Sequence, residues 1–98
     1  MEIIVDLKGL NVKEDVLEAF AKTLKFPDWW GKNWDAFYDC LTDPDFNNFD
    51  KNTKIIIKNF ETFKHNKLEF NKLIQAFSDA KRFNGDNKIM QLSYQFTK

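Results

Sequence analysis

Three short stretches of the chain have the pattern of apolar and polar residues that is typical of β-strands. The first extends from Ile3 to Leu7, and the second is the β-branched run Ile55 to Ile57 between two lysines. The third extends from Lys88 to Phe96. An uninterrupted β-branched run is typical of a strand that is buried on both faces, as in a parallel sheet, so we expect parallel pairing.

A helix of about three turns is predicted between the first two strands. Asn11 is a candidate N-cap, with Glu14 in the position of a capping-box acid. Pro27 should end the helix because it disfavours helical geometry at Phe26. Apolar residues recur at helical spacing between these limits, namely Val16, Leu17, Phe20, Ala21 and Leu24.

A second, shorter helix is predicted before the central strand. Asn33 can cap it, and it should run from Trp34 to about Thr42, closed soon after by Pro44. The residues from Asp43 to Thr53 are expected to form a polar loop that leads to the strand.

A third, longer helix should start at Asn66, with Glu69 in its first turn, and stop at Gly85, which readily adopts the left-handed conformation. Its apolar stripe consists of Phe70, Leu73, Ile74, Phe77 and Ala80. The predicted order is therefore strand, helix, helix, strand, helix, strand. Right-handed crossovers between parallel strands then give an α/β fold, a small sheet with helices packed on it.

The composition fits one compact unit. The chain has 98 residues, of which 43% are apolar and 16% aromatic, enough for one hydrophobic core. We therefore expect a single domain over residues 1–98. The single Cys40 cannot form an internal disulfide, and the first residues have the pattern of neither an export signal nor a membrane span. A cytoplasmic location is the resulting expectation.

The charges balance overall but are unevenly distributed. Fifteen basic and fifteen acidic residues cancel, which disfavours binding to nucleic acid or to membranes through a global field. Residues 28–50, however, contain six acids and one base, so this segment has a net charge of −5 and the remainder carries +5. We expect the acidic segment to prefer a cationic partner.

The helix that begins at Trp34 carries the most informative pattern. At about 100° per residue, one of its faces holds Ala36, Phe37, Cys40 and Leu41. The opposite face holds Trp34, Asp35, Tyr38, Asp39 and Thr42. A solvated helix face is normally rich in Lys, Glu and Gln, so this combination of rings and aspartates indicates a docking surface.

Asp35 and Asp39 lie one helical turn apart with no Lys or Arg at helical spacing, and Asp43 extends the row. Uncompensated carboxylates beside rigid rings are expected at an interface with a basic, phosphate-binding cleft. Trp29 and Trp30, in the preceding turn, would widen the surface. For Trp30, and for the tryptophan that begins the helix, a place in the core is an equally good interpretation.

Three other classes of function fit the residues less well. Two aspartates one turn apart have roughly the 5 Å separation of a retaining glycosidase, but a convex helix face offers no water-poor cleft. A calcium loop starting at Asp43 would have Asn48 in place of the required glycine and Lys54 in place of the bidentate glutamate. Direct nucleic-acid binding would suit the rings, but the aspartates would repel phosphates. His65, in a polar stretch, and Cys40, on the core side of its helix, predict no catalytic site.

Residues 26–42 read FPDWWGKNWDAFYDCLT, and this segment resembles the signature of the barstar family of bacterial ribonuclease inhibitors. The likeness continues more weakly through the first strand and helix, the Ile55 to Ile57 strand and residues 77–81. It implies a two-layer α/β fold with a three-stranded parallel sheet, which agrees with the order of elements predicted above. It also implies an inhibitor rather than an enzyme, with no cofactor and no metal.

The resemblance further implies roles for single positions. Asp39 matches the carboxylate that takes the place of a substrate phosphate, among the arginines and against the catalytic histidine of the ribonuclease. Asp35 matches a second acidic contact and Asp79 a peripheral one, while Trp29 matches an aromatic residue that packs on that histidine and Gly31 permits close approach. The remaining positions of the expected contact surface, some assigned from the helix pattern alone, are Trp30, Asn33, Trp34, Tyr38, Thr42 and Asp43.

The expected partner is a small basic ribonuclease or nuclease toxin, bound one-to-one by a chain that is monomeric when free. The acidic and aromatic helix face would block its phosphate-binding active site. Trp29, Trp34, Tyr38, Asp43 and Pro44 depart from the usual family residues, so the resemblance does not fix which ribonuclease is bound. The alternative is an acidic interaction module for another basic partner.

Overall fold

The computed structural model describes residues 2–43, 53–86 and 93–97. Within these ranges three strands form one sheet, β1 (Glu2–Asp6), β2 (Lys54–Lys58) and β3 (Ser93–Thr97). Their order is β1-β2-β3, and both pairings are parallel. The predicted α/β class and the parallel pairing are therefore confirmed.

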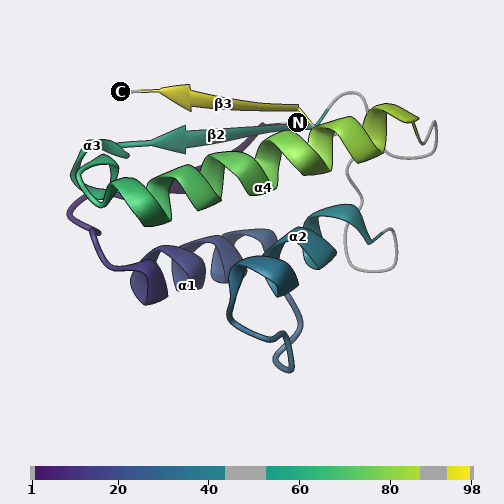
Figure 1. The fold of residues 1–98 in the computed structure, drawn as a ribbon, viewed down its shortest axis with the longest axis horizontal. Helices are drawn as coiled ribbons and strands as arrows, with labels where there is room; N and C mark the ends of the chain where they lie inside the picture. Colours follow the sequence, from purple (N-terminus) through teal and green to yellow (C-terminus); the bar gives the residue numbers. More distant parts are fainter. Residues whose placement is uncertain (1, 44–52, 87–92, 98) are drawn as a thin grey trace.

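The described helices are α1 (Lys13–Leu24), α2 (Trp34–Thr42), α3 (Glu61–Lys64) and α4 (Lys67–Asp86). Figure 1 shows α4 across the middle of the molecule, with β2 and β3 along one side of it and α1 and α2 along the other. Helix α1 contacts β1, whereas α2 packs chiefly against α4. The short α2 is thus held mainly by another helix rather than by the sheet.

Three fully buried phenylalanines join these helices. Phe20 of α1, Phe37 of α2 and Phe77 of α4 are each 0% exposed. The ring centroid of Phe37 lies 5.2 Å from that of Phe20 and 5.5 Å from that of Phe77, both edge-to-face, and the other two rings are 5.6 Å apart. Such pairs contribute about 0.5–1.5 kcal/mol each beyond the area they bury. This phenylalanine triangle fixes α2 against both α1 and α4.

The outer face of the sheet differs from the prediction. Ile55 and Ile57 are fully buried, whereas Ile56 is only partly buried and its strand neighbour Ile4 is 49% exposed. Successive strand residues point to opposite faces, so this alternation means that the described elements cover one face of the sheet and leave the other open. The prediction that the isoleucine run is buried on both faces is wrong.

Helix α1 begins and ends differently from the prediction. Its N-cap is Val12, without a side-chain cap, and not Asn11. The carbonyl of Asn11 instead accepts a hydrogen bond of 3.1 Å from Nδ2 of Asn66, which ties the start of α1 to the start of α4. The helix ends at Leu24 because Lys25 adopts a left-handed conformation with φ of 59°.

Helix α4 is longer than predicted, and its buried stripe differs from the prediction at one position. The helix includes Gly85 and ends at Asp86, so Gly85 does not terminate it. Ile74 is 37% exposed and is not part of the core, whereas Ala76 is 7% exposed and packs inside. The other four predicted residues are buried, so the stripe follows the prediction except that Ala76 takes the place of Ile74. These four residues are Phe70, Leu73, Phe77 and Ala80.

The sequence pattern did not predict α3, a single turn that buries Phe63 completely. Strand β3 begins at Ser93, and the earlier part of the predicted strand, from Lys88, lies outside the described residues. The same holds for residues 44–52 of the predicted polar loop and calcium-like motif. In the part of the chain that is described, none of the helices combines the length and the apolar composition that a membrane crossing requires.

Two adjacent residues of α4 test this assignment of the core. Leu73→Ala removes a fully buried side chain and should lower the free energy of unfolding by about 2–5 kcal/mol. Ile74→Ala, on the exposed side, is the matched control and should cost less than about 1 kcal/mol. Urea denaturation followed by circular dichroism measures both values. Equal losses for the two variants would contradict the orientation of α4.

Candidate functional site

An open groove of about 1030 Å³ lies between α2 and α4. We call it the α2–α4 groove. Its α2 wall consists of Asn33, Trp34, Asp35, Tyr38 and Asp39. Its α4 wall consists of Lys72, Gln75, Ala76, Asp79 and Arg82, and Lys13 of α1 completes the lining. Six of the sequence-predicted contact residues are thereby brought together, five of them on the α2 wall and Asp79 on the other.

The start of α2 is built by a short local network. The Ala36 backbone N–H donates to Oδ1 of Asn33 at 2.8 Å, which confirms the predicted N-cap. Nδ2 of Asn33 donates in turn to the Gly31 carbonyl at 3.2 Å. A Cβ on Gly31 would lie 3.1 Å from the Ala36 Cβ, so glycine lets the loop approach the helix closely. The position where α2 starts is therefore set by residues adjacent to it in sequence.

Asp35 and Asp39 are exposed on α2, as predicted. Across residues 2–43, 53–86 and 93–97, neither carboxylate has a basic group within 4.0 Å or a hydrogen-bond donor on another side chain. Like charges one helical turn apart repel each other by a few tenths of a kcal/mol. The free protein thus presents two carboxylates that its own described side chains do not neutralise.

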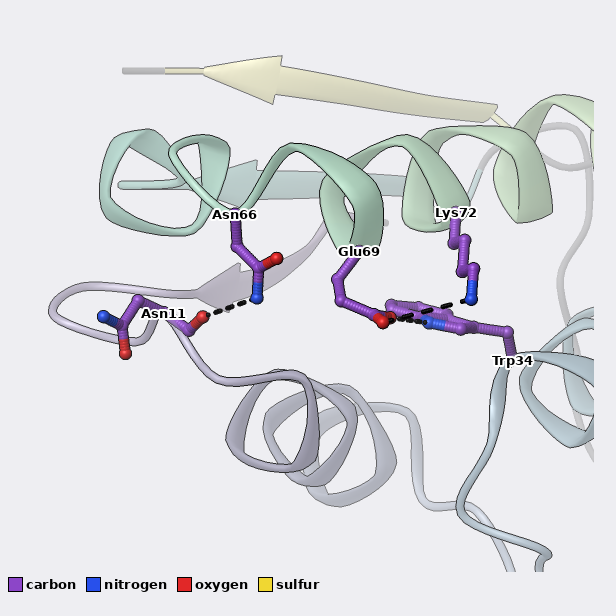
Figure 2. A network of polar contacts seen from close by, with 5 residues as sticks. All are labelled: Asn11, Trp34, Asn66, Glu69 and Lys72. Atoms are coloured by element: carbon purple, nitrogen blue, oxygen red, sulfur yellow. Dashed lines mark hydrogen bonds and ion pairs between the residues drawn. The ribbon is translucent and has the colours of Figure 1, made fainter.

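Trp34 combines the two places that the sequence left open for it, the core and the exposed face. Its ring is half-buried and packs edge-to-face on Phe37, with centroids 5.6 Å apart. Its indole Nε1 donates to Oε2 of Glu69 at 2.6 Å, and Oε1 of Glu69 lies 4.0 Å from the Lys72 ammonium. Figure 2 shows the Glu69 carboxylate with a dashed contact to each of these two side chains. Trp34 therefore ties the first turn of α2 to the first turn of α4 while one side of it lines the groove.

The two adjacent tryptophans before α2 differ in burial. Trp29 is 73% exposed, in agreement with a contact role. Trp30 is only 6% exposed and packs on Phe26 with ring centroids 5.1 Å apart. The expectation that Trp30 belongs to the contact surface is wrong, because the turn closed by its N–H on the Pro27 carbonyl directs its side chain into the core.

The remaining predicted contact residues of α2 lie near its C-terminal end. The Thr42 hydroxyl donates to the Tyr38 carbonyl at 3.0 Å and lies 3.3 Å from the Asp39 carbonyl, so it closes the final turn of the helix. Tyr38 itself is partly buried and lines the groove. Asp43, at the C-cap, is partly buried and does not line the groove.

On the opposite wall, Asp79 has partners within its own helix. Its Oδ1 accepts a hydrogen bond of 2.8 Å from Nε2 of Gln75 and lies 3.8 Å from a guanidinium nitrogen of Arg82. The family resemblance indicated Asp79 but did not indicate Lys72, Gln75 or Arg82. No local signal marks these three residues, because only the packing of α2 on α4 makes them part of the same groove.

Cys40 and His65 are the side chains to examine as candidate nucleophiles or metal ligands. Cys40 is 4% exposed, its burial raises the pKa of the thiol, and the charges of Asp39 and Asp43 raise that pKa further. The thiol is therefore protonated at neutral pH and a poor nucleophile. His65 is exposed. Within the described ranges, no group of three His, Cys, Asp or Glu residues is placed to hold a metal ion.

The chain is similar in sequence to known proteins. The chain is 35% identical over 60 residues to the Bacillus subtilis (strain 168) protein named "Putative ribonuclease inhibitor YrdF". The matched segment covers 61% of this chain and 62% of that protein, so the chain spans less than two thirds of its relative. A family model described as "Barstar (barnase inhibitor)" matches residues 1–95. Because this match extends over almost the entire chain, the chain belongs to the barstar family.

Proposed function

We propose that this chain inhibits a small basic ribonuclease by placing the acidic and aromatic face of α2 in the enzyme's phosphate-binding site. One observation carries the proposal: Asp35 and Asp39 are exposed, one turn apart, and have no basic partner within 4.0 Å in the described part of the chain. Membership of the barstar family supports it, as does the name of the Bacillus subtilis relative.

The two carboxylates suit a cleft that normally binds RNA phosphates. Four residues rise about 6 Å along an α-helix, so Asp35 and Asp39 present two negative charges in a row. Arginine forms the same bidentate hydrogen bonds with a carboxylate as with a phosphate, which lets an aspartate take a phosphate's place. By family resemblance we assign Asp39 to this position and Asp35 to the neighbouring one.

Aromatic rings supply the apolar part of the proposed contact. Trp29 is 73% exposed, and Tyr38 lines the groove beside the carboxylates. Large rigid rings contribute much contact area for little loss of conformational entropy. We assign Trp29 to packing on the catalytic histidine of the ribonuclease, again by family resemblance.

The geometry of α2 is fixed before binding, which favours affinity. Asn33 caps the helix, Phe37 anchors it in the phenylalanine triangle, and Trp34 ties it to α4. Little further ordering is then required when the partner docks.

No catalytic step is required for such an inhibitor. A general acid and a nucleophile act in a water-poor cleft, whereas Asp35 and Asp39 are exposed in an open groove. We propose a non-catalytic protein that forms a one-to-one complex, and its single cysteine, Cys40, supports a cytoplasmic location. An acidic module for a different basic partner is the remaining alternative.

The proposal predicts that the purified chain inhibits at least one member of a panel of small secreted ribonucleases that includes barnase. Inhibition of RNA cleavage should weaken as salt rises, because the Debye length falls from about 10 Å at 0.1 M to about 3 Å at 1 M. Basic proteins without nuclease activity serve as controls. Binding to one of these controls with no ribonuclease inhibited would favour the alternative module.

Removal of a single charge tests the proposed contact. Asp39→Asn keeps the side-chain shape but leaves cationic groups of the partner's cleft desolvated and unpaired, which should cost about 3–5 kcal/mol of binding free energy. Kd for the inhibited ribonuclease, measured by titration calorimetry, should then rise more than roughly 100-fold.

The matched control is Glu18→Gln, which removes the same charge from an exposed position of α1 that does not line the α2–α4 groove. It should change Kd by less than about threefold. Equal Kd values for the two variants would remove Asp39 from the proposed interface.

A further inference from the structure

The two walls of the α2–α4 groove present different charges to a partner. The α2 wall offers the carboxylates of Asp35 and Asp39 and no basic group. The α4 wall contains Lys72, Asp79 and Arg82. A partner that fills the groove therefore meets an acidic wall on one side and a mixed wall on the other.

On the α4 wall the basic side chains are more exposed than the acidic ones. In the pair formed by Lys72 and Glu69, the lysine side chain is 50% exposed and the glutamate 18%. In the pair formed by Arg82 and Asp79, the arginine side chain is 74% exposed and the aspartate 39%. Both carboxylates also accept a hydrogen bond from a neighbour within the protein, Glu69 from Trp34 and Asp79 from Gln75. The accessible ends on this wall are thus mainly positive.

The intramolecular ion pairs leave both basic side chains able to bind a further anionic group. The nitrogen to oxygen distances are 4.0 Å for Lys72 and 3.8 Å for Arg82, both longer than the roughly 2.7–2.9 Å of a charge-assisted hydrogen bond. Exposed ion pairs of this kind contribute little to the stability of the protein. An ammonium has three hydrogen-bond donors and a guanidinium five, so each retains donors for a further acceptor. A partner that offered only positive charge to this wall would be repelled.

We propose that the α4 wall binds an acidic segment of the partner ribonuclease that flanks its cationic cleft, and that Lys72 and Arg82 select for partners carrying such a segment. This inference rests on the proposed function, and it deepens that function by assigning the partner a charge pattern: basic where it meets α2, acidic where it meets α4. Asp79 then acts mainly by holding Arg82 in place, rather than as an acidic contact of its own.

The experiment compares Lys72→Gln and Arg82→Gln with the wild-type chain, using the panel ribonuclease that the chain inhibits most tightly. Removing any cation lowers repulsion from a basic enzyme at long range and so tends to speed association. The informative quantity is therefore the dissociation rate constant, measured by surface plasmon resonance. Each variant should increase it roughly 3- to 10-fold, because a contact formed only in the complex is lost.

Two control variants distinguish the loss of a contact with the partner from a loss of folding and from a change in net charge. Lys67→Gln removes a positive charge from an exposed residue of the same helix that does not line the groove, and its dissociation rate constant should stay within about twofold of wild type. Arg82→Lys keeps the charge and should restore much of the slow dissociation. Thermal unfolding midpoints show whether each variant is folded.

The outcomes distinguish this inference from the proposed function. Unchanged or slower dissociation for Lys72→Gln and Arg82→Gln would mean that these cations only neutralise their neighbours, and it would overturn the inference while the effect of Asp39→Asn still supported the inhibitor. If Asp39→Asn has no effect either, the α2–α4 groove is not the contact surface, and both fail. A chain that inhibits no ribonuclease of the panel likewise contradicts both.

Discussion

The packing of α2 against α4 is the interaction on which the rest of this structure depends. Phe37 of α2 packs in the phenylalanine triangle, and the Trp34 indole donates a hydrogen bond of 2.6 Å to Glu69 of α4. The first contact is apolar and fully buried, and the second is a charge-assisted hydrogen bond at the edge of the core. Together they hold a helix of nine residues, too short to be stable alone, in one orientation. That orientation decides which side chains face solvent.

Because α2 is anchored in this way, it can carry charges that lower its stability. Asp35 and Asp39 repel each other, and the described part of the chain supplies neither with an ion-pair partner. Surfaces that bind a partner often sacrifice some stability in this way, because the compensating charges belong to the other protein. The cost of a few tenths of a kcal/mol is small beside the contribution of three buried aromatic pairs. The same core that stabilises α2 thereby permits its acidic face.

Local sequence signals predicted the elements near the site correctly. The Asn33 cap and the extent of α2 depend on residues adjacent in sequence, and the parallel sheet follows from the order of its elements. The wrong predictions concern residues whose burial depends on tertiary packing rather than on the local sequence. The residue pattern by itself does not distinguish Trp29 from Trp30, since the path of the turn makes one exposed and the other buried. Likewise Ile74 and Ile56 are apolar residues on faces that no described element fully covers. Apart from Asp79, which the family resemblance indicated, the α4 wall could not be predicted, because its residues join the groove only through the contact with α2.

The central claim is that the α2 face occupies the position of a substrate phosphate. Steady-state cleavage of RNA by the inhibited ribonuclease, measured at several inhibitor concentrations over a range of substrate concentrations, tests it most directly. The account predicts competitive inhibition, in which the apparent KM for RNA rises with inhibitor concentration while kcat is unchanged, because substrate and inhibitor exclude each other. A fall in kcat at saturating RNA with KM unchanged would place the inhibitor elsewhere on the enzyme and contradict the account.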